Sequence, residues 1–246
     1  MGSIAVYHSC EEKSKNVAHF YTKTHDSPHR YLAYKDIPPM INQFVKGKKA
    51  LDYGSGTGAS SSFLHSIGLD VTGADISQEM LDKARISLPQ IKFYKPQDLK
   101  LVSHFDLVFS SFVLFELSNK SEITNFLCKV SSFLNEDGIF IGITGSEQMY
   151  SLFRNWYVFD AKFEENRNLK SGSLARILLK HPQIEFYDYY WKEKDYLDCF
   201  AKSELEVLKI LHPTGLSSDP YQWEDELFCS PFTIFIAQKR KNCTFI

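Results

Sequence analysis

Runs of mostly apolar residues alternate with segments whose apolar residues recur three and four positions apart. The first pattern is typical of buried strands and the second of helices packed by one face. Strands are expected at 48–53, 70–75, 91–94, 105–111, 139–144, 205–211 and 232–237. Helices are expected at 57–67, from Ser77, from Ser121 and at 193–203. This alternation predicts a parallel sheet with helices on both faces.

The end of the chain departs from the alternation. Too little helical signal lies between residues 211 and 232 for a crossover helix, so the final strand is expected to run antiparallel. A turn is expected at 135–138, between the helix from Ser121 and the strand at 139–144. The sequence therefore predicts one α/β domain with a doubly wound, seven-stranded, mostly parallel sheet and an antiparallel last strand.

Two segments lie outside this core, which spans 46–144 and resumes at 195–240. Residues 1–45 carry patterns of short helices and are expected to form an N-terminal cap. Residues 145–194 are rich in aromatic side chains and contain two runs, 173–179 and 184–191, that would pair as an antiparallel hairpin. The insert is long enough for a substrate lid. Its rings would either hold a flat, apolar or cationic acceptor or form a small core of their own.

Composition excludes several classes of protein. The 246 residues carry a net charge of −2, which offers no basic surface for nucleic acid. No apolar run is long enough for a membrane span, and residues 1–6 lack the features of a signal peptide. Five scattered cysteines without a Cys-x-x-Cys pair are typical of a reducing compartment, so a cytoplasmic location is expected. Cys243 formally fits a prenylation pattern, but an incidental match in the tail is favoured.

The clearest candidate ligand site is a glycine-rich turn after the first strand. Gly54, Gly56 and Gly58 join this strand to a helix, and in an open α/β sheet ligands lie at such a place. No Gly-Lys-Ser/Thr follows, which excludes a P-loop. Asp75 ends the second strand about 20 residues later, where a carboxylate can accept hydrogen bonds from both hydroxyls of a ribose.

The spacing G-x-G-x-G, with Asp52 two residues before its first glycine, resembles the first motif of the class I S-adenosylmethionine (SAM)-dependent methyltransferases. Phe105-Asp-Leu-Val and the reversed last strand are further resemblances. The resemblance implies SAM as cofactor and S-adenosylhomocysteine as its product. It implies a cofactor site made of Tyr21, Arg30, Asp52, Gly54, Ser55, Gly56, Thr57, Gly58, Asp75, Ile76, Met80, Gln97, Asp98, Leu99, Ser110 and Phe112.

Some of these assignments have equally simple alternatives. Ala18-x-x-Tyr21 and Arg30 resemble the part of the cap that binds the methionine carboxylate of SAM, but they also suit a half-buried tyrosine and a surface arginine. Asp98 would bind the adenine amino group with Leu99 against the ring, or would simply cap a turn.

The class of methyl acceptor is restricted mainly by motifs that this sequence does not contain. Residues 110–113 carry neither the Asp/Asn-Pro-Pro-Tyr/Phe set of nucleic-acid amino-methyltransferases nor carboxylates for Mg²⁺. The layout is most similar to small-molecule methyltransferases of the toxoflavin-pathway and secondary-metabolite type. It implies metal-independent transfer to nitrogen or oxygen of a small acceptor. His212 and Glu116 are candidate bases, or hydrogen-bonding residues around the site.

Two other functions remain open on the sequence alone. The strand, turn and Asp75 also suit an NAD-dependent oxidoreductase, although the glycine spacing argues against it. A SAM-binding regulatory subunit that no longer catalyses would keep the same motifs. The sequence leaves the oligomeric state open.

Overall fold

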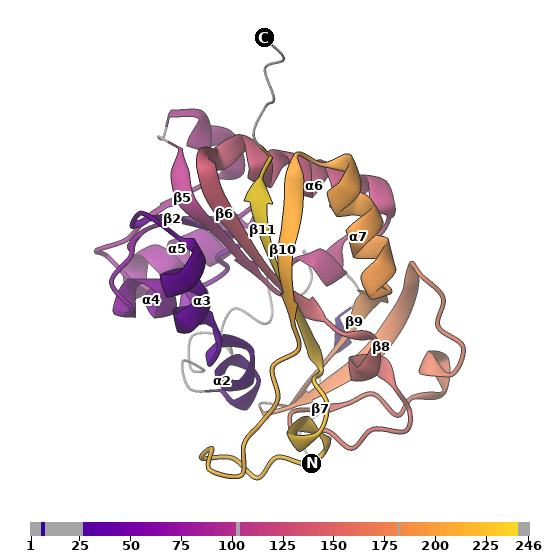
Figure 1. Cartoon of the computed structure of the whole chain (residues 1–246). Coiled ribbons are helices and arrows are strands. Elements are labelled where there is room, and N and C mark those ends of the chain that lie inside the picture. The colour runs from indigo at the N-terminus through magenta and orange to yellow at the C-terminus, as the bar shows by residue number, and fades with distance from the viewer. Residues whose placement is uncertain (1–5, 8–26, 102–103, 182, 241–246) are drawn as a thin grey trace.

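A computed structural model describes residues 6–7, 27–101, 104–181 and 183–240. Its centre is a seven-stranded sheet in the order β10-β11-β6-β5-β2-β3-β4 (Figure 1). The strands are β2 (Lys49–Tyr53), β3 (Asp70–Ala74), β4 (Lys92–Tyr94), β5 (Phe105–Ser111), β6 (Leu134–Gly145), β10 (Leu205–Leu211) and β11 (Phe232–Lys239). Strand β11 is antiparallel to both of its neighbours, whereas β4, β3, β2, β5 and β6 pair in parallel. The predicted fold class is confirmed.

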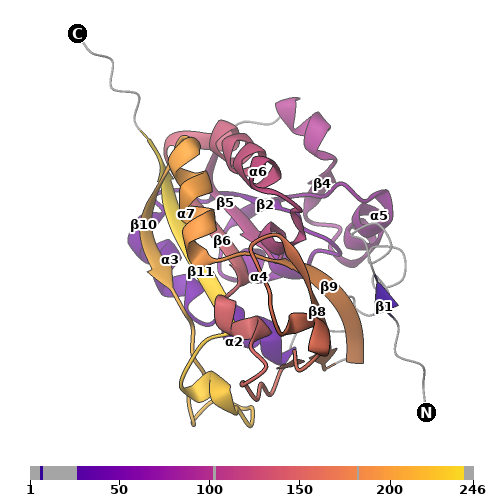
Figure 2. The same cartoon turned by 90° about the vertical axis from the view of Figure 1, so that its right-hand side faces the viewer.

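Helices cover both faces of this sheet (Figures 1 and 2). One side carries α2 (Pro28–Tyr34), α3 (Ile37–Phe44), α4 (Ala59–Ser66) and α5 (Gln78–Ser87), and the other carries α6 (Lys120–Phe133) and α7 (Glu193–Lys202). The two apolar layers follow the period of two along each strand. Phe109 and Ile141 belong to the first layer, whereas their neighbours Val108 and Phe140 belong to the second.

Local sequence explains where the helices begin. Pro28 stands in the first turn of α2, where its missing N–H has no cost. Ser77 caps α5 by accepting a hydrogen bond from the Met80 N–H at 3.4 Å. Asn119 caps α6 in the same way, so this helix begins at Lys120 rather than at Ser121. Of the helical cap expected at 1–45, α2 and α3 are observed, and residues 1–5 and 8–26 lie outside the described residues.

The turn expected at 135–138 lies inside the bounds of β6 (Leu134–Gly145), which follows α6 directly. Pairing with β5 skips residues 135–138, because it passes from Phe105–Leu134 to Leu107–Ile139. A Cβ on Gly138 would lie 3.0 Å from the backbone of Asn135, so the chain turns tightly within this irregular start of the strand. The Asn135 side-chain amide donates to Asp106 on β5 at 2.7 Å and holds the segment against the sheet.

The segment after β6 forms a second, smaller sheet in the order β1-β9-β8-β7. Its strands are β1 (Val6–Tyr7), β7 (Phe159–Asp160), β8 (Ser173–Lys180) and β9 (Gln183–Tyr190). The predicted hairpin is confirmed as β8 and β9, which Figure 1 shows below the carboxyl edge of the central sheet. Strand β1 pairs in parallel with β9, and a strand of two residues is too short for the sequence pattern to predict this pairing. No helix among the described residues has the length and apolar character of a membrane span.

Candidate functional site

The glycine-rich loop runs from β2 to α4 along the edge of β3. All three glycines have left-handed backbones, with φ of +90° at Gly54, +52° at Gly56 and +92° at Gly58. A Cβ at Gly54 would lie 2.3 Å from the Val113 Cγ2, and one at Gly58 would lie 2.7 Å from a Leu88 methyl carbon. These two glycines therefore permit close packing of the protein on itself.

Gly56 plays a different part. A Cβ at this position would meet nothing within 4 Å, so this is the point of the loop that adjoins open space. Its N–H donates to the Asp75 Oδ2 at 2.8 Å, and the Asp75 Oδ1 accepts from the Ser77 N–H at 2.8 Å. The Ile76 N–H also acts on this carboxylate, which has about four acceptor positions, so Asp75 keeps capacity for a further donor. The structure thus brings together the glycine turn and the second-strand acid.

Asp52 lies fully buried beneath this loop. Its Oδ2 accepts hydrogen bonds from Ser60 at 2.7 Å and Ser61 at 2.5 Å, whereas its Oδ1 has no hydrogen-bond partner among the described residues. Burial raises the pKa of Asp52 to about 6, against the effect of the two serine bonds, and the charge of Asp75 adds to the rise. A buried acceptor without a donor is the kind of group that a bound ligand satisfies.

The pKa of the nearby Asp75 carboxyl is also raised. Burial raises its pKa above the ordinary value, and the backbone N–H groups of Ser77 and Gly56 oppose that rise. The hydroxyl of Ser55 is likewise buried without a partner among the described residues. A cluster of under-satisfied polar atoms therefore lies along the glycine turn.

The other predicted cofactor residues are more dispersed. Ile76 is 71% exposed next to Asp75, and Gln97 and Asp98 are exposed in the turn after β4. Leu99 is only 1% exposed and packs in the layer that also contains Leu51 and Val108, so it does not offer a free face.

Thr57, Met80, Ser110 and Arg30 are buried, and the Ser110 hydroxyl donates to the Tyr53 carbonyl at 2.7 Å. The Ser110 hydroxyl therefore already donates its hydrogen to a backbone carbonyl. Tyr21 lies outside the described residues.

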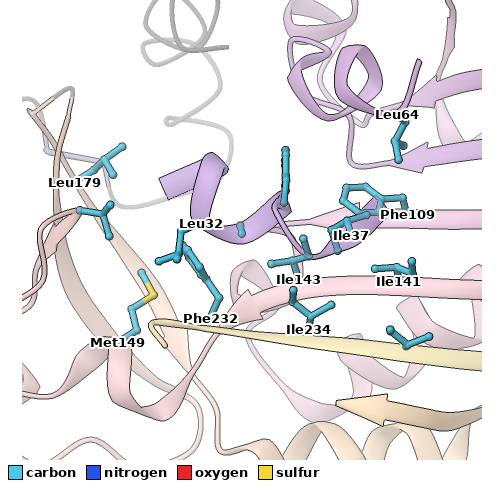
Figure 3. Close-up of a cluster of buried hydrophobic side chains, with 14 of the residues drawn as sticks. Leu32, Ile37, Leu64, Phe109, Ile141, Ile143, Met149, Leu179, Phe232 and Ile234 are labelled. Atoms are coloured by element: carbon cyan, nitrogen blue, oxygen red, sulfur yellow. The ribbon is translucent and has the colours of Figure 1, made fainter. Parts of the chain in front are cut away.

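A pocket with about 560 Å³ of empty space, part of it open to solvent, lies between the carboxyl edge of the sheet and the insert. In Figure 3, Leu179 of β8, Met149 and Phe232 of β11 lie where the insert meets the sheet, and they form part of its lining. The described lining residues are His29, Phe112, Phe115, Glu116, Met149, Phe159, Leu179, Ile184, Phe186 and Phe232. The aromatic insert therefore contributes to a cavity, while its Trp156 and Tyr150 are buried in the same apolar layer as Phe109 and Ile141 of the sheet.

Phe112 connects this pocket to the glycine loop. It follows β5 with φ of +64°, which among the described residues no other non-glycine side chain adopts. The next residue, Val113, packs against Gly54, while Phe112, Phe115 and Glu116 line the pocket. One short segment thus touches both the glycine-rich turn and the cavity, so the two lie side by side.

The structure separates the two candidate bases. Glu116 lines the pocket, but His212 is half exposed and pairs with Glu193 of α7 at 2.9 Å. His29, a residue of α2, also lines the cavity. Its Nε2 is 3.4 Å from the Ser27 hydroxyl and its Nδ1 is buried without a partner among the described residues. Burial, and then the charge of Arg30, hold the pKa of His29 well below its usual range, so the ring is neutral.

Comparisons with known proteins agree with this geometry. Residues 50–138 match the family model of a methyltransferase domain. An uncharacterized protein of Haemophilus influenzae is 29% identical over 86% of this chain and 88% of its own length. An uncharacterized methyltransferase of Synechocystis is 32% identical over 42% of this chain and 50% of its own length.

Solved structures show the same fold. An S-adenosylmethionine-dependent methyltransferase from Clostridium acetobutylicum superposes with a TM-score of 0.63 at 17% identity, covering 92% of this chain and 98% of the other. The CcbJ methyltransferase of Streptomyces caelestis gives 0.63 at 16%, covering 91% and 96%. Residues 50–138 thus match a methyltransferase domain, within a Rossmann-like α/β fold that solved SAM-dependent methyltransferases share.

Proposed function

We propose that this enzyme methylates a nitrogen or oxygen atom of a small molecule bound in the pocket beside the glycine loop, without a metal ion. The observation that carries the proposal is the segment 112–116, whose Val113 packs on Gly54 while Phe112, Phe115 and Glu116 line the pocket. A cofactor on the loop and an acceptor in the pocket would then be neighbours, which is what direct transfer requires.

The residues of the loop fit SAM. The open space at Gly56 accommodates a ligand against the backbone, and Asp75 retains acceptor capacity for a ribose hydroxyl. The buried Asp52 Oδ1 is an acceptor that a donor on the cofactor side would satisfy. SAM supplies a methyl group already activated on a sulfonium, so the protein's contribution is to bind, align and exclude water.

The pocket suits a small acceptor more than a macromolecule. It is a concave cavity with mostly apolar walls and two titratable residues, His29 and Glu116, among its described lining. Walls of this kind bury the body of a small molecule, and a few polar groups orient its reacting atom. Either residue is placed to act on a proton of the acceptor, whereas His212 is not among the lining residues.

Binding of S-adenosylhomocysteine tests the cofactor half of the proposal. Asp75→Ala should weaken this binding by about 2–4 kcal/mol in calorimetric titration, because it removes a charge-assisted acceptor. Asp70→Ala is the matched control, since Asp70 is exposed at the opposite end of β3. An Asp75→Ala variant that folds and binds with wild-type affinity would remove Asp75 from the site. NAD should leave the melting temperature unchanged, whereas S-adenosylhomocysteine should raise it.

Turnover identifies the acceptor. The enzyme is incubated with methyl-labelled SAM and a metabolite extract of the source cell, and the labelled product is identified by mass spectrometry. A labelled small molecule is the expected result. Label confined to protein or nucleic acid would contradict the small-molecule proposal while leaving the methyltransferase activity intact.

A further inference from the structure

The chemical character of the pocket restricts which small molecule it accepts. Eight of its ten described lining residues are apolar, and the other two are His29 and Glu116. Because the His29 ring is neutral, Glu116 is the charged residue among the described lining, and no lysine or arginine belongs to that set. The walls therefore combine an apolar body with one negative group.

A second carboxylate lies behind the same wall. Asp188 is fully buried on β9, two positions beyond Phe186, so both side chains are on the same face of the strand. After the effect of burial, the charges of Asp188 and Glu116 both raise the pKa of Tyr150. Arg30, whose charge lowers the pKa of His29, is the opposing cation on the α2 side, and it does not belong to the described lining. Two carboxylates with low-dielectric surroundings favour a positively charged guest.

The aromatic residues of the pocket favour the same kind of guest. Phe112 lies 6.1 Å from Phe115 and 5.5 Å from Phe232, and Phe232 lies 5.7 Å from Phe159, measured between ring centroids. Rings grouped in this way offer faces to a cation and edges to a flat apolar body. Without a carboxylate this would indicate only an apolar ligand, but together with Glu116 it indicates a cationic head on an apolar frame.

We propose that the acceptor is a small primary or secondary amine with an aromatic or apolar body, which binds as its ammonium ion with the head group at Glu116. The inference rests on the proposed function and names the substrate class of that site. An alcohol, phenol or carboxylic acid gives up its proton before or during attack, and the carboxylates at this pocket disfavour the anionic oxygen that results. The same negative charges stabilise a bound ammonium ion.

The proton balance follows from this arrangement. The bound ammonium gives one proton to the Glu116 carboxylate, and the nitrogen pair that this frees forms the bond to the methyl carbon. The carbon–sulfur bond breaks with its electron pair left on sulfur, so the products are S-adenosylhomocysteine and the N-methylated ammonium. Glu116 then releases its proton to solvent. His29, neutral and with a buried Nδ1, accepts a hydrogen bond from the ammonium and keeps its orientation.

The test compares amines with matched alcohols on the intact protein saturated with S-adenosylhomocysteine. Benzylamine, 2-phenylethylamine and tryptamine are titrated calorimetrically beside benzyl alcohol, 2-phenylethanol and tryptophol. We expect at least one amine to bind about tenfold or more tightly than its alcohol, because the charged hydrogen bond to Glu116 is absent from the alcohol. If no amine exceeds its alcohol, the proposal is overturned.

Variants locate the effect. Glu116→Gln should remove the preference for the amine, leaving affinity for the alcohol and for S-adenosylhomocysteine within about twofold of wild type. Glu164→Gln is the charge-matched control, because Glu164 is an exposed residue of the same insert, paired with Arg167. Persistence of the amine preference in a folded Glu116→Gln protein overturns the assignment to this residue. Loss of S-adenosylhomocysteine binding in that variant would assign Glu116 to the cofactor and overturn the proposal too.

A product measurement separates this inference from the proposed function. Nuclear magnetic resonance of the labelled metabolite distinguishes an N-methyl from an O-methyl carbon. An N-methyl product supports the amine class, and an O-methyl product overturns it while the small-molecule methyltransferase stands. If S-adenosylhomocysteine does not bind at all, the proposed function itself fails, whatever the probe amines do.

Discussion

The two halves of the site are built from different materials. The cofactor edge is made of backbone: the N–H groups of Gly54 and Ser55 both donate to the Ala74 carbonyl, at 2.8 and 2.9 Å, and that of Gly56 donates to Asp75. The pocket beside it is made of side chains that come from α2, the β5 end, the insert and β11. The glycines of the loop tolerate almost no substitution, because their backbone geometry is required. The side chains that line the pocket can be replaced when a different ligand has to be bound.

This contrast matches the division of labour in the reaction. In the proposed function, SAM binding needs a fixed turn and a fixed carboxylate, for which the β2–α4 loop and Asp75 lie together within one βαβ unit. The acceptor needs shape and charge complementarity, which segments distant in sequence supply together. The first half is therefore expected to fail when a glycine changes, and the second when charge or ring area changes.

Gly54→Ala should have the largest effect and would break the cofactor edge. A Cβ there meets Val113 at 2.3 Å, and φ of +90° disfavours alanine, so we expect a loss of about 4 kcal/mol in the free energy of unfolding. Gly56→Ala has only the backbone cost, about 1–2 kcal/mol, but should weaken S-adenosylhomocysteine binding because its methyl group enters the open space. Urea denaturation and calorimetric titration measure the two. Equal stability of both variants would contradict the packing argument.

The pH dependence of stability tests the burial of Asp52 beneath the glycine-rich loop. Its pKa is raised to about 6 in the folded protein, so between pH 4 and 6 the folded state holds a proton that the unfolded state has lost. Stability from this group therefore falls as pH rises through that range and levels off above it, by about 3 kcal/mol in all. Asp52→Asn should flatten this slope in denaturation experiments from pH 4 to 8. Asp70→Asn, at an exposed site, should leave it unchanged, and an unchanged slope in Asp52→Asn would contradict the raised pKa.

Phe186→Leu tests whether the pocket wall is the more tolerant half. Phe186 is only partly buried on β9 and lines the cavity, so the substitution should cost less than about 1.5 kcal/mol of stability. Affinity for S-adenosylhomocysteine should stay within about twofold of wild type, while KM for the acceptor rises because ring area is lost. A large loss of cofactor affinity would show that the two halves are not separable in this way.

His212→Asn should have the smallest effect. The His212 ring is half exposed and pairs with a partly exposed Glu193, and pairs of this kind contribute less than about 1 kcal/mol. Turnover of the identified acceptor and cofactor affinity are expected to match wild type. A fall in turnover with unchanged stability would restore His212 as a functional group and contradict its place outside the pocket.

Much of the fold could be predicted because the evidence is local. Near-continuous apolar runs mark β5 and β11, helical spacing marks α6, and the absence of a crossover helix predicts the reversal of β11. The glycine turn and Asp75 were also visible, since they lie within one βαβ unit and their chemistry depends on residue type and spacing. The start of β6 at Leu134 was missed because the strand begins before the turn at 135–138, which the bond from Asn135 to Asp106 holds against β5.

Only the tertiary structure decided which residues share the pocket. His29 and Glu116 are far apart in sequence, and nothing in their neighbours distinguishes His29 from His212; the packing of α2 against the insert and β11 brings one into the cavity and leaves the other beside α7. Asp52 could be named as an acid of the motif, but its isolation from water follows from the loop folding over it. Spacing along a chain determines backbone geometry nearby, whereas burial and charge depend on which distant segments pack together.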